Sequence, residues 1–478
     1  MSETQQTTLR LRLAYGVGSV AYGVKDNGFS YLLLFYYDVV LGLERSWVAA
    51  ALFAALLVDA ISDPIVGYLS DHWRSRWGRR HPFMYFAAFP VSISYLFLWN
   101  PPSGLSQLQL LAWLFCLAIL VRTLITLYEI PSTALVSELT ENYDERTSLL
   151  SYRYFFGWWG GLTMNALAFL VLFPAAGGQA EPGGYQIYGW IAPGLMCAAI
   201  LISAAGTHHR IPTLKAPPAT DHHSARIAFR ELKETLSNPS IRVLFGGAIF
   251  YGIAAGLSAS INIYINTYFW GLDSEQIGLF SLSYFGSAMI ALPLSPLLSR
   301  KFGKKRAAIG MSLFSLFMLP LVVSLRLFEV MPPNGTSALF FTLLSFNFVD
   351  VMLLISSTTL ISAMVADVVE ESEVSTGRRS EGVFFAARTF ALKIVSGAGI
   401  FSAAVLLSAI GFPSDAAGGA EVAPEVLRRL GIVYVATAGT LYGIAIFFYS
   451  RYRISRQSHE DHLRSLAARG SGDSSKAQ

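Results

Sequence analysis

The sequence predicts an all-helical membrane protein with twelve transmembrane helices in two six-helix bundles, and three observations support this fold class. Of the 478 residues, 53% are apolar and only 14% are charged, whereas about a quarter of the residues of a soluble protein are charged. The apolar residues are gathered in segments long enough to cross a bilayer, which takes about 20 residues per helix. Basic residues fall in alternate connections between these segments.

The apolar segments follow one another with short connections, and we expect each to be a membrane span. They lie at 13–40, 47–70, 83–100, 108–136, 150–173, 187–206, 241–268, 276–299, 307–328, 337–368, 382–411 and 429–450. The first ten residues are polar and are not followed by a cleavage site, so we expect no cleaved signal peptide.

The longest connection divides the chain in the middle. Residues 207–240 contain Pro212, Pro217 and Pro218 and then an amphipathic stretch. We therefore expect a first six-helix bundle at 1–206, a central cytoplasmic loop at 207–240, a second bundle at 241–452 and a mobile cytoplasmic tail at 453–478. A repeated pattern supports this division, because Trp77-Gly78-Arg79-Arg80 follows the second span and Phe302-Gly303-Lys304-Lys305 follows the eighth.

The charge distribution predicts the orientation of the chain. Basic clusters occupy the even-numbered connections, at residues 74–80, 146, 208–215, 300–306 and 378–379. The odd-numbered connections at 174–185 and 329–337 contain no Lys or Arg. By the positive-inside rule both termini face the cytoplasm, and we expect a multi-pass protein of a bacterial inner membrane.

Several functional classes do not fit this composition. The formal charge is only +4 and the basic residues are scattered, which argues against a nucleic-acid partner. The two cysteines, Cys116 and Cys197, lie inside apolar segments without metal-like spacing. With no compact His or Cys constellation, we expect neither an enzyme nor a cofactor.

Two carboxylates in the second span are the first candidate site. Asp59 and Asp63 are four residues apart, so a helix places both on one face, where they repel each other. Charges inside a membrane are costly and mark a function. We expect this pair to hold a coupling cation, either Na⁺ or H⁺; the alternative is a structural pair neutralised by a basic residue from a neighbouring span.

A polar stripe in the fourth span is the second candidate. Arg122, Thr126 and Glu129 recur at spacings of four and three, and we expect Pro131 to interrupt the helix just after them. Such a stripe is suited to holding an ion or sugar hydroxyls. The alternative is an ion pair between Arg122 and Glu129 within the helix, in which each side chain neutralises the other. Further positively charged side chains are those of Lys25, Arg153 and Lys393. They either balance these carboxylates or contact the solute.

Several motifs resemble those of the glycoside-pentoside-hexuronide:cation symporters of the major facilitator superfamily. They are Lys25-Asp26, Tyr36-Tyr37-Asp38-Val39-Val40, Asp59-Ala60-Ile61-Ser62-Asp63-Pro64-Ile65-Val66-Gly67, Ser75-Arg76-Trp77-Gly78-Arg79, Glu129-Ile130-Pro131, Arg153, Met364-Val365-Ala366-Asp367 and Lys393. The resemblance covers both halves of the chain and implies the major facilitator fold.

The resemblance also implies roles for individual residues. Cation binding falls to Asp59, Ser62, Asp63 and Thr126, with Asp59 and Asp63 as the metal ligands if the ion is Na⁺. The solute positions are Lys25, Asp26, Glu129, Arg153 and Lys393, and Arg146 is a gating residue.

The implied function is uptake of a sugar, glycoside or uronide with a monovalent cation by alternating access, in contact with membrane lipid. Ser62 and Glu129 are the two positions at which this sequence departs from the pattern that carries the resemblance. The alternative is a cation-coupled transporter of a lysophospholipid or another amphiphile.

Overall fold

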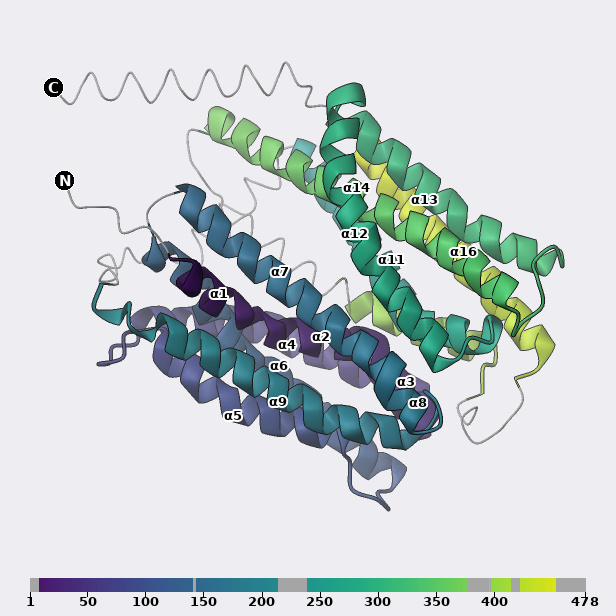
Figure 1. The fold of residues 1–478 in the computed structure, drawn as a ribbon, viewed down its shortest axis with the longest axis horizontal. Helices are drawn as coiled ribbons and strands as arrows, with labels where there is room; N and C mark the ends of the chain where they lie inside the picture. Colours follow the sequence, from purple (N-terminus) through teal and green to yellow (C-terminus); the bar gives the residue numbers. More distant parts are fainter. Residues whose placement is uncertain are drawn as a thin grey trace. The chain divides into compact units, whose positions relative to one another are not determined.

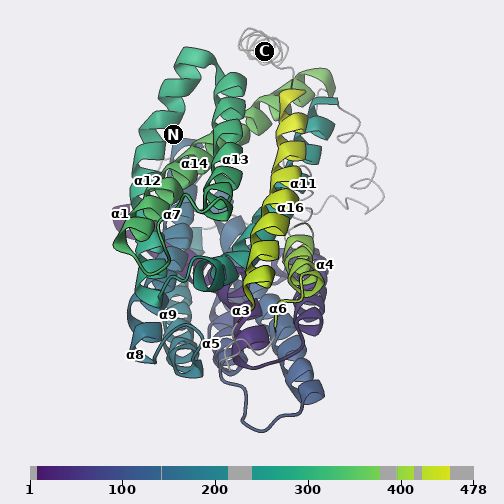
Figure 2. The ribbon, with the colours of Figure 1, turned by 90° about the vertical axis from the view of Figure 1, so that its right-hand side faces the viewer.

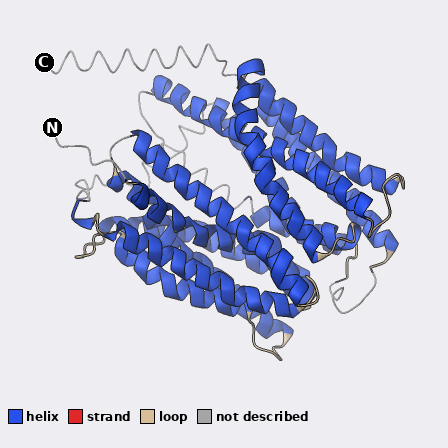
Figure 3. Ribbon diagram, in the orientation of Figure 1, coloured by secondary structure: helices blue, strands red, loops and turns tan. Residues whose placement is uncertain are grey.

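The structure, a computed structural model, describes residues 8–140, 143–213, 239–376, 395, 397–413 and 422–452. Throughout this part of the chain, helices are joined by turns and short loops, and no strand is present (Figure 3). Ten helices within it are long and apolar enough to cross a membrane. Most of the predicted spans are therefore confirmed as long apolar helices.

The long helices match the predicted spans closely. They are α4 (Arg45–His72), α5 (His81–Trp99), α6 (Gln107–Leu139), α7 (Tyr143–Leu167), α9 (Pro182–His208), α11 (Pro239–Tyr264), α12 (Ser274–Phe302), α13 (Lys304–Leu327), α14 (Ser337–Thr376) and α16 (Pro424–Ser450). The predicted eleventh span begins outside the described residues, and an apolar helix at Gly397–Ala409 is its described part.

The first predicted span is a chain of short segments rather than one helix. These are α1 (Leu9–Val17), α2 (Ser19–Asn27), the π-helix η1 (Gly28–Leu32), α3 (Leu33–Phe35) and the π-helix η2 (Tyr36–Val40). Similar π segments, η3 (Ala168–Leu172) and η5 (Ile265–Phe269), follow α7 and α11, and the short α8 (Phe173–Ala175) follows η3. A π turn holds one more residue than an α turn and is frequent at functional sites.

The chain forms two compact units, of which unit 1 comprises Met1–Thr220, Gly256–Leu282 and Ile400–Leu430, and unit 2 comprises Asp221–Ala255, Ser283–Gly399 and Gly431–Gln478. In unit 1, α4 and α5 both pack on α6, and α9 packs on α5 (Figure 1). In unit 2, α13 and α14 lie side by side (Figure 2). The predicted boundaries at 206 and 241 stay a prediction.

The core of unit 2 is a cluster of buried apolar side chains contributed by several helices. Its members are Leu244, Ala307, Ala308, Met311, Leu360, Met364, Ala445, Tyr449 and Tyr452. Small residues among them let the helix backbones approach closely, as is usual in membrane helix packing.

Glycines bring α2 and α7 into close contact in unit 1. A Cβ atom on Gly23 would lie 1.8 Å from the carbonyl oxygen of Gly157, and one on Gly161 would lie 2.6 Å from the carbonyl oxygen of Gly23. Any larger residue would force the two helices apart. This close packing fixes the position of α2, which carries Lys25 and Asp26, relative to α7.

The outer face of α5 shows which solvent the helix meets. Phe86, Phe89, Ile93 and Phe97 are all exposed, and their spacings of three and four residues place them on one stripe. A stripe of exposed large apolar side chains suits lipid and not water.

Candidate cation and solute site

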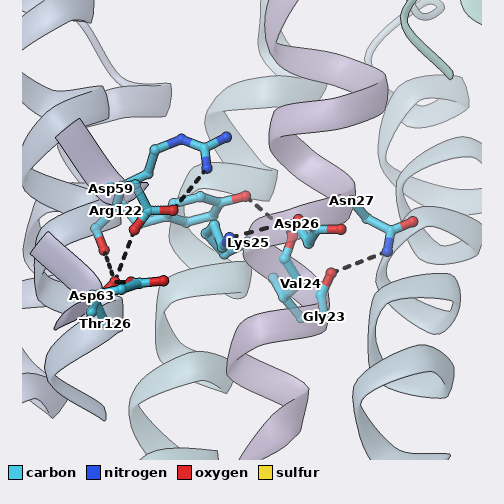
Figure 4. A network of polar contacts seen from close by, with 10 residues as sticks. Gly23, Val24, Lys25, Asp26, Asn27, Asp59, Asp63, Arg122 and Thr126 are labelled. Atoms are coloured by element: carbon cyan, nitrogen blue, oxygen red, sulfur yellow. Dashed lines mark hydrogen bonds and ion pairs between the residues drawn. The ribbon is translucent and has the colours of Figure 1, made fainter. Parts of the chain in front are cut away.

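The carboxylates of Asp59 and Asp63 meet at the hydroxyl of Thr126, and these are three of the residues to which the resemblance assigns cation binding. The Thr126 Oγ1 lies 2.9 Å from Asp59 Oδ1 and 3.2 Å from Asp63 Oδ1 (Figure 4). Asp59 and Thr126 are buried, and Asp63 is partly exposed. Helices α4 and α6 therefore bring an acidic pair and a hydroxyl to one point inside an apolar bundle.

The hydroxyl of Thr126 has fewer hydrogens to donate than there are oxygens around it. Its hydroxyl has a single hydrogen, yet three oxygens lie within bonding distance, because the Arg122 carbonyl is 3.0 Å away as well. The hydroxyl can donate to only one of them at a time. A bound cation would bring the two carboxylate oxygens and the Thr126 oxygen together without needing that hydrogen.

Arg122 contributes a positive charge beside this pair. Its Nη1 donates to Asp59 Oδ2 at 3.4 Å, and its guanidinium lies 4.6 Å from the centre of the Phe29 ring. The Arg122 to Glu129 contact considered above is therefore wrong, since Arg122 turns to Asp59. Arg122 therefore compensates part of the negative charge on Asp59.

Ser62 takes a different position from its two acidic neighbours. Its hydroxyl donates to the Asp59 carbonyl at 3.0 Å, one turn back on the same helix. The oxygen still has lone pairs for a cation, but its hydrogen is committed to the helix. Its role as a cation ligand stays a prediction.

Lys25 and Asp26 lie on α2 beside the acidic pair (Figure 4). The buried Lys25 Nζ is 3.6 Å from Asp26 Oδ1 and 4.3 Å from the centre of the Tyr22 ring. The Asp26 side chain is 50% exposed, so this carboxylate remains within reach of a solute. Helix α2 contacts α6, on which α4 also packs, so the three helices converge near these residues.

Glu129 and Arg153 form a direct ion pair between α6 and α7. Arg153 Nη2 lies 2.7 Å from Glu129 Oε1, and Arg153 Nη1 donates to Ser132 Oγ at 2.9 Å. The second oxygen of Glu129, Oε2, is buried and has no hydrogen-bond partner in the described structure. Tyr15 completes the group, because its hydroxyl donates to the Ser132 carbonyl.

The helix geometry corrects one expectation at this site. Proline was expected to interrupt the fourth span, but α6 runs without a break from Gln107 to Leu139 with Pro131 inside it. Pro131 has no amide hydrogen, so the helix lacks one backbone hydrogen bond at this residue. Close to it, the hydroxyls of Ser132 and Thr133 donate to the Glu129 carbonyl. Arg122, Thr126 and Glu129 therefore lie on one continuous helix.

The two remaining predicted site residues are Lys393 and Arg146. Lys393 lies outside the described residues. Arg146 is at the start of α7, where its Nη2 donates to the Thr140 carbonyl at 3.3 Å. Its position near the end of α6 suits a gating residue, and that role stays a prediction.

One charged network has no counterpart among the predicted site residues. Arg79 and Arg80 both contact Glu138 Oε1, at 2.8 and 3.0 Å, and Arg80 also pairs with Asp71. In the sequence, this basic cluster indicated the orientation of the chain, the internal repeat and the family resemblance, but no ion-pair partner was predicted for it. Glu138, at the far end of α6, could not be paired with it from spacing alone.

The comparisons with known proteins agree with this architecture. The family model of MFS/sugar transport proteins matches residues 14–456. The chain is similar to the isoprimeverose transporter of Lactiplantibacillus pentosus, at 25% identity over 92% of this chain and 88% of that one. It is also similar to the inner membrane symporter YicJ of Escherichia coli, at 26% identity over 82% and 81%.

A solved structure shares the fold. The D-xylose-proton symporter superposes with a TM-score of 0.58 at 17% identity, over 93% of this chain and 98% of that one. The expected major facilitator fold and the expected non-enzymatic, transporting class are therefore confirmed. The chain belongs to the family of MFS/sugar transport proteins.

Proposed function

We propose that this protein takes up a sugar, glycoside or uronide together with one monovalent cation, Na⁺ or H⁺, by alternating access. The observation that supports this most strongly is the meeting of Asp59, Asp63 and Thr126 inside an apolar bundle, next to the ion pair of Glu129 and Arg153. Charged groups buried in a membrane protein are costly and are retained for function. The sugar transporter among its relatives supports the solute class.

The cation is assigned to the acidic pair. Asp59 and Asp63 supply the negative charge, Thr126 supplies a neutral oxygen, and Arg122 compensates part of the charge on Asp59. The carboxylates would attract a monovalent cation to this point. Ser62 is the further ligand that the resemblance implies.

The solute is assigned to the neighbouring charged groups. The half-exposed Asp26 and the unoccupied Oε2 of Glu129 are acceptors for sugar hydroxyls, and Arg153 and Lys25 are donors. Lys393 is the expected contribution of the second half. Because Glu129 and the proposed cation ligand Thr126 both lie on α6, ion binding is able to change the electrostatic field at the solute position.

A ligand screen by thermal shift tests this assignment, since a ligand that binds only the folded state raises its melting temperature. We expect one class of sugar or glycoside to stabilise the detergent-purified wild type, and the shift to depend on Na⁺ or on pH. The Arg153→Ala variant should show no such shift. A response to lysophospholipids and to no sugar would contradict the proposal and favour an amphiphile transporter.

The orientation of the chain is proposed from charge alone, with both termini in the cytoplasm of a bacterial inner membrane. Glu181 and Lys301 lie in connections of opposite predicted sidedness, and both are exposed. We expect an impermeant thiol reagent added to intact cells to label Glu181→Cys and to spare Lys301→Cys, in a background without Cys116 and Cys197. Labelling of both, or of Lys301→Cys only, would refute the topology.

A further inference from the structure

A buried cluster of five residues in unit 1 lies outside both proposed sites. We call it the Asp38 cluster, and its members are Asp38, Arg45, Tyr264, Phe412 and Pro413. The side chain of Asp38 is fully buried and that of Arg45 is 4% exposed. The resemblance motif included Asp38, but the proposed function assigns it no role.

The contacts in the cluster are numerous and short. Arg45 Nε donates to Asp38 Oδ2 at 2.6 Å, and the Tyr264 hydroxyl donates to the same oxygen at 2.7 Å. The remaining Arg45 nitrogens, Nη1 and Nη2, donate to the carbonyls of Phe412 and Pro413 at 3.0 and 3.2 Å. The guanidinium also lies 5.8 and 5.3 Å from the ring centres of Tyr264 and Phe412.

These contacts join segments from the two sides of the predicted central loop. Asp38 and Arg45 precede the loop, seven residues apart, whereas Tyr264, Phe412 and Pro413 follow it. Three of the four hydrogen bonds therefore cross between the two predicted halves. We propose that the Asp38 cluster is a latch that closes the end of the transporter assigned to the outside and opens in each transport cycle.

The charge distribution suits a reversible contact. The only two opposite charges of the cluster lie on the same side of the loop, so separating the halves does not pull an ion pair apart. The crossing partners are a neutral hydroxyl and two neutral carbonyls. Water can replace each of them when the end opens, whereas hydrogen bonds to a charged group still favour closure.

The backbone holds the latch in position. Asp38 lies in the π-helix η2, and Tyr264 immediately precedes the π-helix η5. The hydroxyls of Tyr36 and Tyr37 donate to the carbonyls of Trp99 and Leu98, at 3.0 and 2.7 Å, and so anchor η2 to the end of α5. The carboxylate of Asp38 is thus presented by a fixed segment.

Neutral contacts beside the cluster join the same two parts of the chain. Gln179 Nε2 donates to Thr267 Oγ1 and to the Leu272 carbonyl, at 3.1 and 3.3 Å, and the Gln179 side chain also bonds to Ser274. Asn165 Nδ2 donates to Ser281 Oγ at 3.1 Å. The two predicted halves are therefore joined at this end by polar contacts, and Arg45 is the charged donor in the hydrogen bonds to Phe412 and Pro413.

The latch is tested by pulsed electron spin resonance between two labels. We choose Ser103→Cys and Val330→Cys, two exposed positions in connections assigned to the outside, in a background without the native cysteines. Arg45→Gln removes both crossing bonds to the carbonyls, and Tyr264→Phe removes one bond while leaving the ion pair intact. Arg429→Gln is the matched control, because it removes an exposed arginine paired with Glu425.

We expect Tyr264→Phe to raise the ratio of the population with a long distance between the labels to that with a short distance by about fivefold. Arg45→Gln should raise this ratio further, and the control should leave it unchanged. If Arg45→Gln does not fold, the double variant Asp38→Asn with Arg45→Gln removes both charges together. Distance distributions like those of the control in Tyr264→Phe and in the foldable Arg45 variant would overturn the latch. The measurement needs no solute, so it is independent of whether the sugar assignment holds.

Discussion

Asp63→Asn is expected to abolish cation-driven accumulation of the solute while preserving its exchange down a gradient. Asparagine keeps the shape of the side chain but removes the charge that partners the cation. With Arg122 already beside Asp59, loss of the charge on Asp63 would greatly weaken the attraction of the site for a cation. The solute position at Glu129 and Arg153 would be left intact.

Proteoliposomes with an imposed ion gradient provide the measurement for this variant. The accumulation ratio should fall by at least about tenfold, which corresponds to a loss of about 1.4 kcal/mol of coupling free energy. Glu44→Gln is the control, because Glu44 is an exposed acid that precedes the first residue of the same helix. Uphill accumulation by Asp63→Asn equal to that of the control would remove Asp63 from the cation site.

Arg153→Ala is expected to weaken solute binding by at least about tenfold. The substitution removes donors from Ser132 and from Glu129, and it leaves a carboxylate in α6 without its ion pair. Breaking a buried charged pair typically costs about 2 to 5 kcal/mol, much of it from the group left behind. Glu129 would then be misplaced as an acceptor for a solute hydroxyl.

Equilibrium binding of the solute found in the ligand screen measures this effect. Arg306→Ala, which removes an exposed arginine near the start of α13, is the control and should bind with wild-type affinity. Monodisperse elution in detergent establishes that the Arg153 variant is folded. Unaltered affinity in a folded Arg153→Ala protein would place the solute elsewhere.

Short-range patterns in the sequence predicted part of the contacts in the candidate cation site. Four-residue spacing is enough to place Asp59 and Asp63 on one face of α4, whereas the family resemblance, and not the spacing, assigned Thr126 to the same site. Helical periodicity alone carries such information. It does not say which acid a buried arginine chooses, so the partner of Arg122 was open until α4 and α6 were seen together.

Ion pairs between residues far apart in the chain could not be predicted from the sequence. Glu138 meets Arg79 and Arg80 from positions about sixty residues away, because α5 packs on α6. Asp38 and Arg45 are close in the chain, yet their contact needs the turn at Gly42, whose φ of 68° suits glycine. The π segments that break up the first span also leave no signal in an apolar run.

Uphill accumulation in wild-type proteoliposomes tests the central claim most directly. A labelled solute identified by thermal shift is presented at equal concentration inside and outside, and a gradient of Na⁺ or of H⁺ is then imposed. The account predicts that one of the two gradients drives net accumulation, and that an ionophore which dissipates it abolishes the effect. Equilibration without accumulation under both gradients would contradict cation-coupled symport.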